Sequence, residues 1–412
     1  MFPGRYDVAA YSAFIFYSMS SLVIPVVLVA MGRELHFPLD DGGMSYGGIL
    51  HLVRSAAMVL SLLSCGIIAG KSGKRLPMGW GVFAIGVSIF LCGCAPGYWF
   101  LLPLLLAAGL GEGICEGLAT PFVQALHPDN PEKYVNIAHS FWSVGIGICV
   151  LGAGAMLSCG VSWRIILAVT GTGTVAASLL FLCRDSRRHP YPEQREKSDF
   201  NKVWQNSKSI FKYPRFWLYC AGMFMGAGAE FCLTFWAAVF LQLTFGATPF
   251  AAGTGTAAIA LGMFAGRNIF ARIATEKNLR KILISSSLCT IPLTLLLAWI
   301  KADMFPSDSV MYATLMSILF LCGIGISPYW PTLQVHGVNR MRKEDSTLLY
   351  IYFSAMGIPG CGFFTWIIGV LGDKFTLQKA FYLLPVTLLI YAGIILADRF
   401  VKNEPAATEG EV

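Results

Sequence analysis

Twelve long apolar segments set the strongest limit on what this chain can fold into. They lie at residues 8–31, 45–70, 76–96, 98–126, 135–159, 162–183, 216–242, 248–271, 282–300, 308–336, 346–371 and 380–398. A helix needs about 20 apolar residues to cross the hydrocarbon core of a bilayer. Because lipid offers no hydrogen-bond partners, spans of this length must be helices that satisfy their own backbone groups. We therefore predict an all-α membrane protein with twelve transmembrane helices.

The composition agrees with the membrane class. Hydrophobic residues make up 56% of the 412 residues and charged residues only 13%, whereas charged residues average about 25% in soluble domains. Most of the twelve cysteines lie inside the apolar segments, and none is spaced with histidine as a metal ligand would be. We interpret the cysteines as packing residues and expect no metal or redox site.

The distribution of basic residues predicts the orientation of the chain in the membrane. The formal net charge is +7, and 23 of the 30 lysines and arginines fall on the side of the termini, against five on the opposite side. Basic residues concentrate on the cytoplasmic side of membrane proteins. We therefore expect both termini in the cytoplasm, and a lipid bilayer rather than nucleic acid as the partner. Twelve spans with short loops suit a bacterial inner membrane.

The apolar pattern breaks once, in a charged segment between the sixth and seventh spans. This break divides the chain into an N-terminal six-helix bundle (1–184), a cytoplasmic linker (185–214), a C-terminal six-helix bundle (215–402) and a disordered cytoplasmic tail (403–412). Linker residues 200–211 favour an amphipathic helix on the inner membrane surface. Pro121-Phe-Val-Gln124 in the fourth span resembles Pro331-Thr-Leu-Gln334 in the tenth, which indicates a faint internal repeat. Two repeated six-helix bundles with a substrate site at their interface are a common transporter architecture.

The stretch from Gly109 to Gln124 places two acids inside the fourth span. Glu112 and Glu116 are four residues apart and so share one helical face. An acid inside a membrane is costly and is by default a functional-site hypothesis. We predict that Glu116 carries a coupling proton, which it binds in one conformation and releases in another. The alternative is a protonated acid that is hydrogen-bonded to a neighbouring helix. Glycines at positions 109, 111, 113 and 117 predict close approach of that neighbour.

Other polar residues also lie deep in the predicted spans. Arg54 either neutralises Glu112 or Glu116, or binds an anionic group of the substrate through its planar guanidinium. Glu112 is a substrate ligand, or it pairs structurally with Arg54, His51 or a backbone group. Glu230 in the seventh span hydrogen-bonds substrate, holds a second proton or stabilises the fold. His139 is a candidate proton relay, and a single structural hydrogen bond is the alternative.

Aromatic residues and helix breakers predict a cavity and its gates. Aromatic faces can line a sugar site, although aromatics in spans more often serve packing. The candidates are Trp142, Trp236, Tyr329 and Trp330. Pro328 and Pro331 flank the last two, and residues 357–360 contain another proline, so we expect the tenth and eleventh spans to break or bend. Arg267, near the inner end of the eighth span, is interpreted as a cytoplasmic gate or a lipid-headgroup contact and not as a substrate ligand.

The turn between the second and third spans carries a family resemblance. The major facilitator superfamily has the signature Gly-x-x-x-Asp-Arg/Lys-x-Gly-Arg/Lys-Arg/Lys there, and this chain matches it at Gly66, Lys71, Gly73, Lys74 and Arg75. With its twelve spans and long central loop, the chain resembles that superfamily over its whole length. The resemblance implies the two-bundle major facilitator fold and a gating role for Lys71, Lys74 and Arg75. Gly70 stands where the signature has the aspartate that provides a charge latch.

Two shorter stretches resemble the fucose permease-like sugar:proton symporters. They are residues 116–123 and 136–145. In that family a glutamate in the fourth span, and a glutamine and an asparagine in the fifth, bind sugar or handle the proton. Glu116 matches the glutamate, whereas His139 stands in place of the glutamine and Trp142 in place of the asparagine. The family's aspartate in the first span is absent here.

These observations predict a proton-coupled importer of a small polar solute, a sugar or sugar acid, that works by alternating access. The alternative is a proton-driven exporter of drugs or metabolites, although residues 143–156 lack the proline of the drug antiporter signature. No nucleophile elbow, phosphate loop or metal constellation predicts an enzyme. We expect a small-molecule substrate, no cofactor besides the proton, and a monomer in the bilayer.

Overall fold

The structure, a computed structural model, describes residues 4–129, 131–183, 191–192 and 200–401, and within them it is helical with no strand. The helices are α1 (Arg5–Glu34), α2 (Met44–Ser72), α3 (Arg75–Gly93), α4 (Tyr98–Leu126), α5 (Pro131–Ser158), α6 (Trp163–Leu182), α7 (Phe200–Phe211), α8 (Pro214–Phe245), α9 (Pro249–Ile273), α10 (Leu279–Trp299), η1 (Ala302–Met304), α11 (Asp308–Ile326), α12 (Pro331–Arg340), α13 (Ser346–Lys374), α14 (Leu377–Ala380), α15 (Leu383–Ala397) and η2 (Asp398–Phe400). Within these residues, twelve stretches are long and apolar enough to cross a membrane. This confirms the predicted all-α membrane protein.

The tenth span is broken as predicted, and the eleventh is not. α11 ends at Ile326 and α12 begins at Pro331, because proline has no N–H with which to continue the helical ladder. α13 runs unbroken through Pro359, so of the predicted break or bend, a break does not occur there. Neighbouring helices in a membrane bundle can satisfy the backbone group that such a proline frees.

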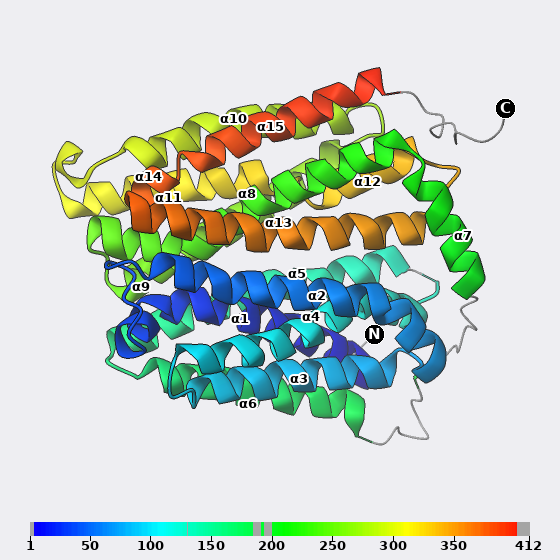
Figure 1. Ribbon diagram of the computed structural model, residues 1–412, viewed down its shortest axis with the longest axis horizontal. Coiled ribbons are helices and arrows are strands. Elements are labelled where there is room, and N and C mark those ends of the chain that lie inside the picture. The colour runs from blue at the N-terminus through cyan, green and yellow to red at the C-terminus, as the bar shows by residue number, and fades with distance from the viewer. Residues whose placement is uncertain (1–3, 130, 184–190, 193–199, 402–412) are drawn as a thin grey trace.

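The spans form two six-helix bundles that lie side by side (Figure 1). We call α1–α6 the N-bundle and α8–α15 the C-bundle. Both termini and α7 lie at one end of the molecule (Figure 1), which we call the termini end, and the opposite end is the far end. The predicted linker border near residue 184 and the predicted tail, 403–412, lie outside the described residues.

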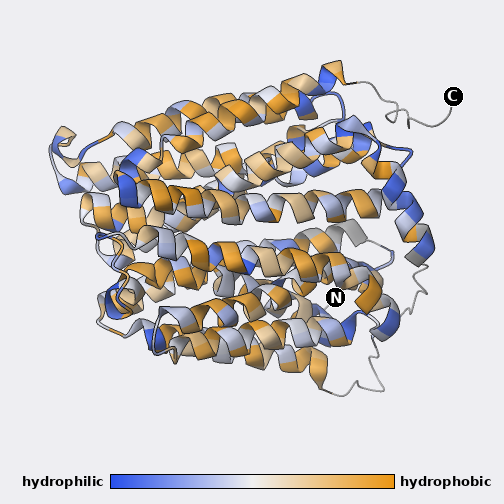
Figure 2. Cartoon of the chain, viewed as in Figure 1, coloured by the Kyte–Doolittle hydropathy of each residue, from blue (hydrophilic) through white to orange (hydrophobic). Residues whose placement is uncertain are grey.

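Hydrophobic residues predominate along the spans (Figure 2), and some of them are strongly exposed. Leu60, Trp80 and Leu261 are each more than half exposed. Exposed apolar area on this scale is unfavourable in water and marks a surface that another phase covers. Hydrophilic residues gather at the two ends and along α7 (Figure 2), as expected where a bilayer ends.

Glycine allows α4 to approach α2 closely. A Cβ atom at Gly109 would meet the backbone carbonyl of Arg54, and one at Gly113 would meet the backbone carbonyl of Met58. The predicted small-residue packing is therefore confirmed for this helix pair. Because the two backbones are so close, the side chains of Arg54 and Glu112 meet across them.

The two bundles are joined at the far end through helix termini. The carboxylate of Asp373, near the end of α13, accepts hydrogen bonds from the backbone N–H groups of Met44 (2.7 Å) and Ser45 (2.8 Å) in the first turn of α2. The first N–H groups of a helix lack partners within it and favour a negative charge. At the corresponding place in the repeat, the Ser158 hydroxyl at the end of α5 accepts from Phe250 N–H at the start of α9 (2.9 Å). We call these two contacts the far-end latches.

The linker helix and the C-bundle meet at the termini end. α7 confirms the predicted helix at residues 200–211. The Ser207 hydroxyl lies 2.5 Å from the Tyr352 hydroxyl, and Ser209 donates to the Glu344 carboxylate at 3.0 Å. These contacts fasten α7 to the beginning of α13 and to the segment before it.

A buried charge cluster that was not predicted closes the C-bundle at the same end. Arg215 at the start of α8 and Asp398 after α15 form a 2.8 Å ion pair, with both side chains about 2% exposed. Arg340 at the end of α12 pairs with the other oxygen of that carboxylate at 3.2 Å. The cluster ties three helix ends together, and we interpret it as structural.

Candidate functional site

The acid and the arginine deepest in the N-bundle form a closed ion pair. Arg54 donates through Nε and Nη2 to the two carboxylate oxygens of Glu112, and also to the Ser21 carbonyl (3.1 Å) and hydroxyl (3.0 Å). The two side chains are only 3% and 2% exposed. Of the interpretations left open for Arg54 and Glu112, the structure realises the internal ion pair. Every charged atom of the pair is occupied, so neither residue offers a free group to a ligand in this conformation.

Glu116, one turn further along α4, has a different environment. The Tyr17 hydroxyl of α1 donates to its Oε2 at 3.4 Å, and no cation of the described residues pairs with it. The carboxylate is half-buried. The ring of Tyr17 packs edge-on against Trp142 of α5, with centroids 4.5 Å apart. Tyr17 was not a sequence candidate, since a tyrosine in an apolar helix resembles any packing aromatic.

His139 of α5 lies near Glu116 in the N-bundle. Its Nε2 is 3.0 Å from the Thr120 hydroxyl of α4, and its ring packs on Phe14 of α1 with centroids 4.6 Å apart. The side chain is nevertheless exposed, although it sits eight residues into the helix. Exposure inside a span means that the ring borders open space in this conformation.

Glu230 and Arg267 face the N-bundle from the opposite side. Arg267 Nη2 of α9 lies 3.5 Å from Glu230 Oε1 of α8, with side chains 36% and 14% exposed. Glu230 Oε2 and Arg267 Nε are buried atoms without a hydrogen-bond partner. Arg267 has a charge interaction with His139 across the bundle interface. The guanidinium of Arg267 thus contacts an acid of the neighbouring helix, and its predicted role as a cytoplasmic gate or lipid-headgroup contact stays a prediction.

A residue of the C-bundle connects the two acids. The Cys361 thiol of α13 lies within electrostatic range of both Glu116 and Glu230. The carboxylates thus approach the same part of the interface, one from each bundle. Together with His139 and Arg267, they form the group of side chains that we call the interface cluster.

Between the interface cluster and the far end, the two bundles are in contact with each other. His51 of α2 stacks on Phe231 of α8 with centroids 4.2 Å apart and rings nearly parallel. The space bordered by His51, Arg54 and Phe235 has no room for a water molecule. The cluster is therefore sealed on its far-end side.

The four aromatic candidates divide into two pairs. Trp142 and Trp330 are half-buried and keep some accessible surface. Trp236 and Tyr329 have none: the Trp236 indole donates to the Thr365 carbonyl at 3.0 Å, and Tyr329 packs on the Tyr391 ring. Only the first pair can line a cavity in this conformation.

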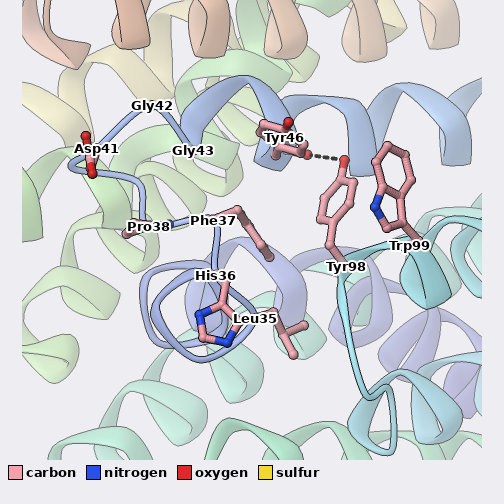
Figure 3. Close-up of a pocket in the computed structure, with 10 residues that line it drawn as sticks. All are labelled: Leu35, His36, Phe37, Pro38, Asp41, Gly42, Gly43, Tyr46, Tyr98 and Trp99. Carbon is pink, nitrogen blue, oxygen red and sulfur yellow. Dashed lines mark hydrogen bonds between the residues drawn. The ribbon is translucent and has the colours of Figure 1, made fainter.

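A separate hollow lies at the far end (Figure 3). It measures about 350 Å³ and is lined by the α1–α2 connection and the start of α4, including His36, Asp41, Tyr46, Tyr98 and Trp99. The Tyr98 hydroxyl donates to the Tyr46 carbonyl at 2.9 Å. Trp99 precedes Glu116 by 17 residues, or about 26 Å of helix, so this hollow is not part of the interface cluster.

The sequence matches the model of the Major Facilitator Superfamily over residues 9–361. The chain belongs to this superfamily. No curated protein sequence gives a significant match. Within the described residues, no group of three histidine, cysteine or acidic side chains could hold a metal ion.

Solved structures of other transporters share the fold. One is a bacterial homologue of the human lysosomal transporter Spinster in an inward-facing, unoccupied conformation (17% identity over 97% of this chain and 98% of that chain, TM-score 0.74). Another is the E. coli fucose:proton symporter (18%, 96% and 98%, 0.64). A third is a D-xylose-proton symporter (12%, 98% and 99%, 0.73). At these identities the likeness establishes the fold and nothing finer.

The superfamily signature turn lies at the termini end of the N-bundle. Lys71 is exposed and Lys74 is half-buried. Arg75 donates through Nη1 to the Phe181 carbonyl at 2.6 Å, in the last turn of α6, where carbonyls lack helical partners. The arginine of the signature thus holds α3 to α6 within one bundle. Its gating role, like that of the two lysines, stays a prediction.

Proposed function

We propose that this transporter imports a small polar solute, a sugar or sugar acid, together with protons, by alternating access. Membership of the superfamily supports transport rather than enzymatic chemistry. Two of the structural relatives are named as proton symporters of fucose and of xylose. The small polar substrate and the proton coupling are carried to this chain as a proposal on that basis.

The observation that carries the proposal is the contrast between the two glutamates of α4. Glu112 is locked to Arg54, so protonating it would break a buried ion pair. Glu116 has only the Tyr17 hydroxyl as a partner, so it can gain or lose a proton without stranding a cation. Its position at the interface between the bundles suits a group that meets water from alternate sides.

The proposed orientation follows from the basic residues at the termini end. If that end is cytoplasmic, the far-end latches close the protein toward the outside. The interface cluster then communicates with the cytoplasm, where import would release solute and proton. Location in a bacterial inner membrane and a monomeric state belong to the same proposal.

The roles within the cluster follow from accessibility. Glu116 is the proposed proton carrier, with His139 and Glu230 as further proton sites. Trp142 and Trp330, which keep accessible surface, are the proposed walls of the solute site.

The test uses the purified protein in liposomes with an imposed inward proton gradient. Radiolabelled L-fucose, D-glucose and D-glucuronate serve as probes, chosen after a thermal-stabilisation screen, because binding to the folded state raises the apparent melting temperature. We expect Glu116→Gln to abolish gradient-driven accumulation while solute exchange without a gradient persists. Glu276→Gln is the matched control, since Glu276 is 65% exposed and pairs with Arg342 at the surface.

Unchanged accumulation by Glu116→Gln would refute the proposed proton carrier. Stabilisation by a lipophilic cation such as tetraphenylphosphonium, with no response to any sugar or sugar acid, would refute the importer and support the exporter of drugs or metabolites.

A further inference from the structure

The Glu230–Arg267 pair differs from the other two arginine–carboxylate pairs of the interior. Arg54–Glu112 and Arg215–Asp398 are about 2–3% exposed and their carboxylates are held by direct hydrogen bonds. The Arg267 guanidinium is 36% exposed and its nearest approach to Glu230 is 3.5 Å, which is longer than a charge-assisted hydrogen bond. A guanidinium in a membrane interior that is not fully paired is costly.

The unused atoms of this pair are buried and directed at no other protein group. Arg267 Nε has no acceptor, and Glu230 Oε2 has no donor. Arginine presents its N–H groups in a planar fork that matches a carboxylate with two parallel hydrogen bonds. Glu230 occupies only part of that fork, so the guanidinium can accommodate a second anionic group.

The packing of α5 against α9 places Arg267 at the bundle interface. The two helices touch near the far end, where a Cβ atom at Gly253 would meet the Val150 carbonyl. Toward the termini end, His139 lies 11 residues from Val150, about 17 Å, and Arg267 lies 14 residues from Gly253, about 21 Å. The two side chains therefore reach a similar depth on facing helices, in agreement with their charge interaction.

The charges around this point do not balance by themselves. Arg267 is the single permanent cation of the interface cluster, which also holds two acids, and it pairs with one of them, Glu230. The Cys361 thiol of α13 and the Tyr391 hydroxyl of α15 also lie within electrostatic range of Glu230. If Glu230 takes up a proton, Arg267 is left without a counter-charge.

We infer that Arg267 anchors a carboxylate of the transported solute, which takes the place of Glu230 against the guanidinium. The inference rests on the proposed function and narrows its substrate class to sugar acids or similar small hydroxy acids. As the solute carboxylate pairs with Arg267, a proton from solvent binds Glu230 and forms the only new covalent bond, O–H. One anion and one proton enter together, so the net charge of the site does not change.

The experiment compares D-glucuronate with D-glucose, which differ by a carboxylate in place of a CH₂OH group. Binding is measured by calorimetry and thermal stabilisation on the purified full chain. We expect glucuronate to bind wild type at least tenfold more tightly than glucose. Arg267→Gln should weaken glucuronate binding roughly 10- to 100-fold, the effect of one charge-assisted hydrogen-bond pair, and leave glucose binding unchanged.

Two further variants separate anchoring from folding. Arg267→Lys keeps the charge but loses the fork, so it should recover part of the glucuronate affinity. Glu230→Gln removes the competing anion, so glucuronate should bind more tightly at pH 7.5 and with a weaker dependence on pH. Arg342→Gln, at a surface pair that is 65% exposed, should match wild type.

The outcomes distinguish this inference from the proposed function. If neutral sugars are accumulated with protons and Arg267→Gln binds glucuronate as wild type does, the anchor is refuted while the symporter stands. If glucuronate binding requires Arg267 but uptake ignores the proton gradient, proton coupling is refuted while the anchor stands. If neither probe shifts the melting temperature, both are overturned. Tighter binding of glucose 6-phosphate than of glucuronate would also refute the inference that the anchored group is a carboxylate.

Discussion

The buried pair of Arg54 and Glu112 allows the most quantitative test of the N-bundle. Glu112→Gln keeps the size of the side chain and removes its charge. The Arg54 guanidinium, 3% exposed, would then keep only the Ser21 carbonyl and hydroxyl and the new amide as partners. Breaking a buried ion pair from one side costs about 3–5 kcal/mol. At roughly 2–4 °C per kcal/mol for a unit of this size, the melting temperature should fall by roughly 6–20 °C.

Replacing both partners separates a charge effect from a packing effect. Arg54→Met with Glu112→Leu removes both charges and keeps most of the volume. Substitution of a whole buried ion pair by apolar residues is often neutral or stabilising. The double variant should therefore be more stable than Glu112→Gln, and the double-mutant cycle that it forms with the single variants Arg54→Met and Glu112→Leu should give a coupling energy of about 1 kcal/mol or more.

The assay is thermal unfolding in detergent, followed by tryptophan fluorescence and by the monodisperse fraction after heating. Glu276→Gln serves as the control, since its exposed pair with Arg342 should contribute about 1 kcal/mol or less. A Glu112→Gln melting temperature within 2 °C of wild type, or a double variant that is as unstable as the two single changes summed, would show that the pair does not act as a buried ion pair.

Two further predictions concern helix contacts. Asp373→Ala removes two charge-assisted hydrogen bonds of a far-end latch, at roughly 1.5–3 kcal/mol, and should open the far end about tenfold or more to a labelling reagent at an introduced cysteine; Ser158→Ala, which removes one neutral bond, should have a smaller effect, and equal effects would contradict the role of the charge. Gly113→Ala places a methyl group against the Met58 carbonyl and should lower stability by about 1–3 kcal/mol, whereas unchanged thermal unfolding would mean that α2 and α4 can separate freely.

The spans could be predicted because each one satisfies its own physical requirement. An apolar run must be a helix in lipid whatever its neighbours are, and proline marks where a helix cannot continue. The fourth span was therefore correct at both ends, and the break after Ile326 was located by Pro328 and Pro331. At Pro359 the same logic allowed a break or a bend, and the helix is continuous there.

The candidate site was predicted less completely, because it depends on pairs that are distant in sequence. An acidic residue inside an apolar segment is visible in the sequence, so Glu112, Glu116 and Glu230 were all identified as candidates. Their partners could not be deduced in the same way. Glu112 had several possible partners, and the ion pair with Arg54 follows only from the close approach of α2 and α4. Tyr17 carries no sequence signal that separates it from a packing aromatic.

The sequence by itself determined that the protein lies in a membrane, where its spans run and which residues are costly to bury. These properties depend on composition and on the local pattern of apolar residues. Only the tertiary structure decided which of these charged residues pair with one another and which can still bind a proton or a ligand. In the structure Arg54 pairs with Glu112, Glu116 accepts a hydrogen bond from the Tyr17 hydroxyl, and Arg267 lies beside Glu230. Charge pairing inside a membrane acts over a few ångströms, and only the packing of helices fixes distances on that scale.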